Sequence, residues 1–267
     1  MKERFELLLS LKTLEYEINE LLNFSRECEE CYELLQNKLD SLHAFMTCEK
    51  NVNSWDKWGL DEVILTSSER VREASVRALC DMEKHQSTRT CHHQLSGSEY
   101  IQTLSESVKK ELDDYGINEL SNVLFIGSGA FPISALTIAS EKGASVCCLD
   151  IDAEAVALGR KLAEWTGLES KVAFTDQKPE RVTFTKGATH IFIASLVEDK
   201  QGVLRSLQDT VHHQAKIILR YGNGLKSIFN YPVDPHRLTD WSVINTHHGE
   251  GIYDTIVLEK KIHNATT

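Results

Sequence analysis

The chain has 267 residues, of which 41% are hydrophobic and 26% are charged, proportions typical of a globular protein with a full core. Its formal net charge of -11 repels nucleic acid and anionic membranes, so we expect neither as a partner. No window of about 18 consecutive apolar residues predicts a membrane span or a signal-peptide core, and we therefore expect a cytoplasmic protein.

The first part of the chain, residues 1–117, has the spacing of helices. Apolar residues recur at three- and four-residue steps between Phe5 and Leu22, and again between Cys31 and Leu42. The segment Thr66–His85 opens with Thr and Ser residues suited to capping, which predicts a helix that begins there. Strand signals are nearly absent, so we predict an all-helical N-terminal domain over residues 1–117.

The second part, residues 118–267, alternates short apolar runs with helical stretches. The runs are NVLFIG, SVCCLDID, KVAFTD, THIFIAS and AKIILRYG, and helical spacing lies between them, as in Ile133–Lys142 and Ala153–Trp165. This alternation predicts an α/β fold with a Rossmann-like, doubly wound sheet of five parallel strands. The final stretch WSVINTHHGEGIYDTIVLEKK predicts an antiparallel pair of strands at the sheet edge.

A glycine-containing loop follows the first predicted strand, at the edge of the sheet where ligands bind. Gly127 and Gly129 permit positive φ and a close approach of the backbone to a ligand. We therefore place a nucleoside-containing cofactor against the loop residues Gly127, Ser128, Gly129, Ala130, Phe131 and Pro132.

Acidic residues after the next two predicted strands extend this candidate site. Asp150 follows the second strand, where a carboxylate can accept hydrogen bonds from both hydroxyls of a ribose. Its neighbour Ile151 belongs to the same predicted cofactor site. Asp176 or Gln177, after the third strand, could contact an adenine amino group.

Two alternatives exist for this loop. Glycines at a turn between a strand and a helix, and an Asp after a strand, also occur without any ligand. Among ligands, NAD is disfavoured because Phe131 and Pro132 fill the place of the third glycine, which lets a helix pack tightly beside a pyrophosphate. S-adenosylmethionine (SAM) has no pyrophosphate, and the bulky loop therefore favours SAM.

The motifs GSGAFP and IFNYP are unusual for ordinary methyltransferases, and together with CLDID and FTDQ they resemble those of nicotianamine synthases. The likeness is greatest to the bacterial nicotianamine-synthase-like enzymes of staphylopine-type metallophore synthesis, and it is strongest over Leu124–Pro232. It implies that SAM is a co-substrate whose 3-amino-3-carboxypropyl (aminobutyrate) group passes to the α-amine of histidine, with 5′-methylthioadenosine released. Geometry selects this product, because the sulfonium activates three carbons and the one in line with the nucleophile reacts.

The resemblance also implies two catalytic residues, and the end of the fifth predicted strand supplies candidates for binding the acceptor. Glu83 and Tyr100 match the glutamate and tyrosine that line the catalytic cavity of the family, where a base must take a proton from the acceptor amine. Taken alone, Glu83 could be a solvated helix charge and Tyr100 a half-buried anchor. Cations or polar groups must hold the carboxylates, and for this we predict Arg220, Asn230 and Tyr231, although any one of them could instead be a surface residue.

We predict no metal requirement. Cys28 and Cys31 form a CxxC motif, but no second paired spacing completes a structural zinc site. The product of the family binds metal, and the resemblance implies a downstream opine dehydrogenase that consumes it. A homodimer is the commonest state of soluble enzymes, and the sequence leaves the oligomeric state open.

Two rival functions remain at this point. One is a SAM-dependent small-molecule N-methyltransferase, which the reaction products would distinguish. The other is a non-catalytic SAM-domain protein whose helical part binds a partner.

Overall fold

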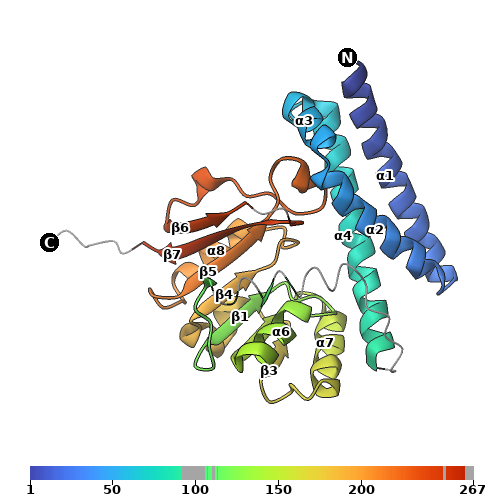
Figure 1. Ribbon diagram of the computed structural model, residues 1–267. Coiled ribbons are helices and arrows are strands. Elements are labelled where there is room, and N and C mark those ends of the chain that lie inside the picture. The colour runs from blue at the N-terminus through green and yellow to red at the C-terminus, as the bar shows by residue number, and fades with distance from the viewer. Residues whose placement is uncertain (92–105, 107, 110–111, 113, 249–250, 262–267) are drawn as a thin grey trace.

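The structure is a computed structural model that describes residues 1–91, 106, 108–109, 112, 114–248 and 251–261. Helices occupy the N-terminal part and a twisted sheet with its own helices occupies the rest (Figure 1). Within residues 1–91 the helices are α1 (Lys2–Glu27), α2 (Cys31–Thr47), α3 (Glu49–Trp58) and α4 (Glu62–Cys91).

The helical part has its own apolar contacts, and the predicted spacing accounts for them. On α1 the buried apolar residues recur at three- or four-residue steps, which places them on one face of the helix. That face packs against α2 and α4, whose buried residues follow the same rule. The helical prediction for this region is therefore confirmed over residues 1–91.

The predicted start of α4 is wrong. The helix begins at Glu62, and the N–H groups of Val63 and Ile64 donate to Asp61 Oδ1 at 3.1 and 3.3 Å. Asp61 is therefore the capping residue. The hydroxyls of Ser67 and Ser68 lie inside the helix and donate back to backbone carbonyls one turn earlier, so they satisfy themselves without ending the helix.

The sheet has seven strands in the order β3-β2-β1-β4-β5-β7-β6. The strands β1 to β5 are parallel, whereas β7 is antiparallel to both β5 and β6, which confirms the predicted five parallel strands and edge pair. Their bounds are β1 Asn122–Ile126, β2 Ser145–Leu149, β3 Val172–Thr175, β4 His190–Ile193, β5 Lys216–Tyr221, β6 Trp241–His247 and β7 Asp254–Lys260.

Alternate side chains of the strands enter two different apolar layers. In β1, Val123 and Phe125 face the layer under α6 (Ile133–Lys142) and α7 (Ala153–Trp165), while Leu124 faces the opposite layer. That opposite layer includes α8 (Lys200–Gln208). Cys147 and Cys148 fall on opposite faces in the same way, and all seven cysteines of the chain are free thiols.

Short 3-10 helices lie in the connections from β3 to β4 and from β5 to β6. They are η1 (Pro179–Arg181), η2 (Thr183–Gly187), η3 (Gly224–Ile228) and η4 (Pro235–Arg237). No helix in the described ranges is both long and apolar enough to cross a bilayer.

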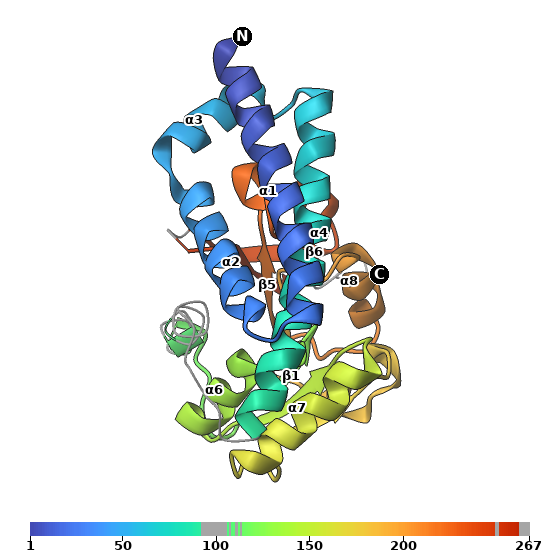
Figure 2. The ribbon, with the colours of Figure 1, turned by 90° about the vertical axis from the view of Figure 1, so that its right-hand side faces the viewer.

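The helix α4 joins the two parts of the molecule. Its last turns lie beside α7, and its middle packs against η3 (Figure 2). The apolar core of the helical part therefore also contains residues from the second half of the chain: Leu225, Ile228, Phe229, Ile252 and Tyr253. The consequence for function is that a face of α4 meets the loops at the carboxyl ends of the parallel strands.

Candidate active site

The glycine loop between β1 and α6 has the backbone that its sequence predicts. Gly127 and Gly129 have φ of 77° and 70°, a region that side chains with a Cβ rarely adopt. The N–H groups of Gly127 and Ser128 donate to the carbonyl of Leu149 at 2.8 and 3.2 Å, which ties the loop to the end of β2. The loop is therefore a fixed turn at the carboxyl edge of the sheet.

The bulky residues of the loop face inward. Ala130 and Phe131 are buried, and Phe131 packs in the layer under α6. Pro132 is also buried and directly precedes the first residue of α6. These side chains anchor the loop in the core.

Asp150 lies directly beside the glycine loop. Its Oδ2 accepts the N–H of Gly129 at 2.8 Å, and its Oδ1 accepts the N–H of Asp152 at 3.0 Å. The side chain is only partly buried, so its carboxylate is accessible to a ribose. The structure thus brings the two predicted halves of the nucleoside site together.

Ile151, Asp176 and Gln177 lie at the outer rim of this edge. Ile151 is fully exposed, and Asp176 and Gln177 are exposed after the end of β3, the strand next to β2. None of the three is needed to fill the core, and their assignment to the adenine end of a nucleoside stays a prediction.

Glu83 reaches the glycine loop from α4, across the two parts of the molecule. A Cβ built on Gly129 would collide with the Glu83 carboxylate. The N–H groups of Ala130 and Phe131 donate to that carboxylate. Glu83 is therefore neither a solvated helix charge nor remote from the site, but a partly buried acid placed against the loop.

The surroundings of Glu83 favour its protonated form. Burial raises the pKa of this carboxyl to about 8, and the negative charge of Asp150 adds to the effect. The two loop N–H groups oppose the shift because they stabilise the ionised form. A carboxyl with such a pKa can accept a proton near neutral pH, as a general base must.

The predicted acceptor residues occupy different surroundings. Arg220 is 3% exposed, donates from Nη1 to Ser134 Oγ at 3.1 Å, and lies over the rings of Phe192 and Tyr253. A guanidinium buried among rings at the end of β5 retains its charge and its planar donors.

Asn230 and Tyr231 make contacts that hold the chain after η3. Asn230 is fully buried, and its Nδ2 donates to the carbonyls of Ile252 and Lys226 at 2.7 and 3.2 Å. The hydroxyl of Tyr231 donates to Glu73 Oε1 on α4 at 3.0 Å. Within the part of the chain that the structure describes, these hydrogen bonds lead to Ile252, Lys226 and Glu73 and not toward Glu83.

Two further predictions concern Tyr100 and metal binding. Tyr100 lies outside the described residues. Among the described residues, no group of three or more His, Cys, Asp or Glu side chains is arranged to hold a metal ion.

Sequence comparison places the site in a family. Residues 98–266 match the sequence model described as nicotianamine synthase protein. The chain is 41% identical over 260 residues to an L-histidine 2-aminobutanoyltransferase of Pseudomonas aeruginosa, covering 97% of this chain and 99% of that relative. This chain belongs to the nicotianamine synthase family. A second family member, the L-histidine 2-aminobutanoyltransferase of Yersinia pestis, is 32% identical and covers 97% of both chains.

Solved structures show that the nicotianamine synthase fold extends over the helical part as well. MtNAS in complex with MTA and tNA superposes with a TM-score of 0.78 at 17% identity, covering 94% of this chain and 98% of that one. A point mutant of MtNAS in complex with S-adenosylmethionine gives 0.75 and covers 92% and 97%. At this identity the likeness concerns the fold alone.

Several charged residues around the site carried no sequence signal. Lys84, next to Glu83, forms ion pairs with Asp152 and Glu154. Lys200 is buried, and its ammonium donates to the carbonyls of Ser195 and Val197 at 2.8 and 2.6 Å. Lysines are common on helix surfaces, so only the folded chain distinguishes these two from solvated charges.

Lys200 holds in place the segment after β4 that packs against the glycine loop. Burial, with a smaller contribution from Arg72, lowers its pKa to about 7. The loop that it holds contains Val197, whose side chain lies against Gly127 so closely that a Cβ there would be 2.5 Å away. The requirement for glycine at this position therefore has a packing cause as well as a conformational one.

Proposed function

We propose that this chain transfers the 3-amino-3-carboxypropyl group of SAM to the α-amine of histidine and releases 5′-methylthioadenosine. The observation that carries the proposal is the contact of Glu83, on α4, with the loop Gly127–Pro132. The names of the two histidine aminobutanoyltransferase relatives support the same reaction.

The residues for binding SAM come from the carboxyl edge of the sheet. The positive-φ glycines let the backbone approach the ligand, and Asp150 offers its carboxylate to the ribose hydroxyls. Ile151, Asp176 and Gln177 flank the adenine end. The loop contains no charged side chain, which suits a cationic sulfonium better than a pyrophosphate.

Glu83 acts as the general base in this proposal. The acceptor arrives with a protonated α-amine, and Glu83 takes that proton. The amine lone pair then attacks Cγ of the methionine chain, and the electrons of the C–S bond pass to sulfur, which leaves as a neutral thioether. We assign Tyr100 as the second catalytic residue on the basis of the resemblance.

Arg220, Asn230 and Tyr231 are our candidates for the acceptor side. Arg220 supplies a permanent positive charge for a carboxylate. Asn230 retains its Oδ1, which has no hydrogen-bond partner among the described residues, while its Nδ2 braces the chain. Tyr231 would act together with Glu73, to which its hydroxyl is bonded.

The cellular setting is part of the same proposal. We place the enzyme in the cytoplasm, with an opine dehydrogenase consuming its product in metallophore synthesis. The reaction as written needs no metal, and a homodimer is our expectation for the enzyme in solution.

The decisive experiment is a product assay. Purified protein is incubated with SAM and histidine, and the products are analysed by mass spectrometry. The reaction geometry predicts methylthioadenosine and an adduct about 101 Da heavier than histidine. S-adenosylhomocysteine with a methylated product would instead identify the N-methyltransferase alternative.

Substitution of the base separates catalysis from binding. Glu83→Gln should reduce turnover by about 10²–10⁴-fold because the variant has no proton acceptor. Calorimetric binding of SAM should persist. Unchanged activity or phenotype in Glu83→Gln and Tyr100→Phe would support the non-catalytic alternative.

The pH dependence of the reaction follows from the same residue. Because the pKa of Glu83 is about 8, its basic form increases as the pH rises toward that value. We expect kcat/KM to rise with pH and level off above about pH 8. This rise with pH should be absent from the residual activity of Glu83→Gln. A wild-type kcat/KM that does not change between pH 6 and pH 9 would contradict the assignment.

A further inference from the structure

Lys84 connects α4 to the segment that follows β2. Its ammonium contacts Asp152 Oδ2 at 2.7 Å and Glu154 Oε2 at 2.6 Å. The hydrogen bond to Asp152, followed by that to Glu154, raises the pKa of Lys84. Because its pKa is raised, Lys84 remains a cation throughout the working pH range. Its side chain is 28% exposed, so salt in the solvent screens the two ion pairs only partly.

The contacts of Lys84 continue to the predicted ribose carboxylate. The N–H of Glu154 donates to Asp152 Oδ1 at 2.9 Å, and the N–H of Asp152 donates to Asp150 Oδ1 at 3.0 Å. Asp150 in turn accepts the N–H of Gly129, the residue that faces Glu83. The contacts therefore lead from Lys84 through Asp152, Asp150 and Gly129 to Glu83, the residue next to Lys84 on α4.

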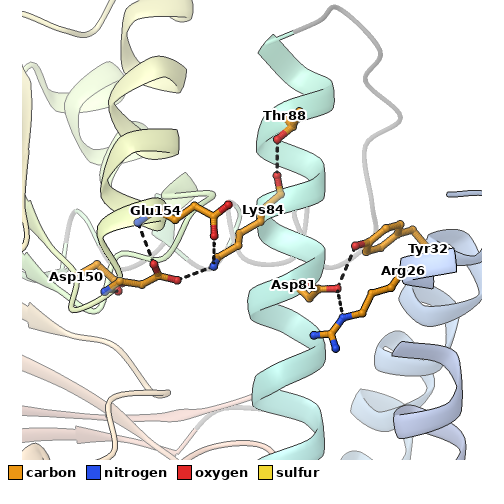
Figure 3. A network of polar contacts seen from close by, with 8 residues as sticks. Arg26, Tyr32, Asp81, Lys84, Thr88, Asp150 and Glu154 are labelled. Atoms are coloured by element: carbon orange, nitrogen blue, oxygen red, sulfur yellow. Dashed lines mark hydrogen bonds and ion pairs between the residues drawn. The ribbon is translucent and has the colours of Figure 1, made fainter. Parts of the chain in front are cut away.

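The same turn of α4 is also fixed on its other side. Asp81 accepts a hydrogen bond from the hydroxyl of Tyr32 at 3.0 Å and pairs with Arg26 Nε at 3.5 Å. Figure 3 shows Asp81 and Lys84 leaving opposite sides of the helix, one toward α1 and α2 and the other toward Glu154. The turn that carries Glu83 is thus held between the helical part and the sheet.

We infer that Lys84 is a positioning residue of the proposed reaction, whose two ion pairs hold the base on α4 in register with the carboxylate that binds the ribose. The inference rests on the proposed function, because it assigns a role relative to Glu83 and Asp150. It goes beyond that function in naming a residue that touches neither substrate.

A change at Lys84 should also alter the titration of Glu83. Among the residues that the structure describes, the charged and titratable groups around Glu83 are Asp150 after the end of β2, the thiol of Cys80 one turn earlier on α4, and the Lys84 group with Asp152 and Glu154. The glycine loop contributes backbone N–H groups only. Without the ammonium, the carboxylates of Asp152 and Glu154 are uncompensated, which disfavours ionisation of Glu83.

The main test compares three lysine variants. Lys84→Met removes the charge but keeps much of the length, and Lys84→Arg restores the charge. Lys38→Met is the matched control, because Lys38 pairs with Glu17 at 2.7 Å between α2 and α1, with a similarly exposed side chain (25%), away from the SAM loops. Steady-state kcat, KM for SAM and the pH profile are measured by methylthioadenosine formation, and melting temperatures are measured in parallel.

We expect Lys84→Met to lower kcat/KM for SAM by about 10- to 100-fold, the loss that a misplacement of about 1 Å can produce. The rise of its kcat/KM with pH should occur at a higher pH than in the wild type. Lys84→Arg should recover most of both properties, and Lys38→Met should match the wild type. If Lys84→Met is poorly folded, Glu154→Gln, which removes one ion pair at an exposed carboxylate, should raise KM for SAM by a smaller factor.

The inference would be overturned if Lys84→Met kept the pH profile and the KM for SAM of the wild type. It would also be overturned if Lys84→Met and Lys38→Met lost kcat/KM equally. Failure of the wild-type enzyme to form methylthioadenosine would overturn the proposed function instead. In that case SAM affinity decides the inference, since Lys84→Met must still weaken calorimetric binding of SAM through the Asp150 segment.

Discussion

At the scale of single residues, Glu83 shows how opposing effects are combined in one carboxyl group. Burial and the charge of Asp150 favour the protonated acid, while the N–H groups of Ala130 and Phe131 favour the carboxylate. Ionisation of Glu83 is therefore unfavourable in the folded protein, although the two N–H groups hold the carboxylate in the orientation of a base. Its contribution to stability should therefore depend on pH in the direction opposite to that of an ordinary salt-bridged acid.

Glu83→Gln should stabilise the protein more at alkaline pH than at acidic pH. The folded-state pKa of Glu83, about 8, lies above its ordinary value of 4.5, so wild-type stability falls as pH rises between these values. The neutral amide avoids this loss and should add about 1–3 kcal/mol to the free energy of unfolding at pH 9. Urea unfolding at pH 5 and pH 9 measures it, and an equal effect at both would disprove the argument.

Gly129 offers a second test at this scale. Gly129→Ala combines a strained φ of 70° with a collision against the Glu83 carboxylate. Gly167→Ala is the control, because its φ of 71° is equally strained while nothing lies within 4 Å of the new Cβ. We expect each to lose about 1 kcal/mol of stability from the backbone alone. Only Gly129→Ala should also weaken SAM binding in calorimetry, and equal affinities in both variants would contradict the predicted contact.

At the scale of elements, the sequence predicted the sheet better than the helical part. Ile133–Lys142 and Ala153–Trp165 are helices with the predicted bounds, because apolar strands flank them and a turn glycine, Gly143 or Gly167, follows each. The start of α4 was missed because Ser67 and Ser68 have the composition of caps although their hydroxyls are satisfied within the helix. Asp61 is held in place by Arg4, a partner 57 residues away, which no local pattern reveals.

Asp61 supplies the prediction for this element. Asp61→Ala removes the cap of α4 and leaves Arg4 without its bidentate partner at 2.9 Å, so the urea concentration at the midpoint of unfolding should fall. Asp61→Asn can still cap and should lose less. Urea unfolding checks the order of the three proteins, and an Asn variant as unstable as the Ala variant would show that capping contributes nothing here.

At the scale of the whole molecule, the site exists only where the two parts meet. The loop, Asp150 and the ligand edge could be predicted from the sequence, because they follow one another along the sheet. The approach of Glu83 could not be predicted from spacing, since it depends on how α4 crosses that edge, and only the family resemblance indicated it. Lys84 carried neither kind of signal. The domain boundary near residue 117 stays a prediction, although the apolar core around α4 includes Leu225 and Tyr253.

Binding of SAM should stabilise both parts together. A ligand at about 100 times its dissociation constant adds about 2.7 kcal/mol to the stability of everything that unfolds with the site. Because α4 belongs to both parts, we expect a single calorimetric transition that moves to higher temperature with SAM and is unaffected by NADH. Two transitions, of which only the second responds, would show that the helices unfold independently of the site.

The shared core around α4 has a consequence for synthesis of the protein. Residues 1–91 leave the ribosome well before Leu225 and Tyr253, which cover the apolar surface of these helices. At usual elongation rates this delay is roughly 10–30 s, far longer than a helix needs to form. During that time the nascent helices expose an unfinished apolar face, so the chain is most vulnerable to aggregation and most dependent on chaperones before its last strands emerge.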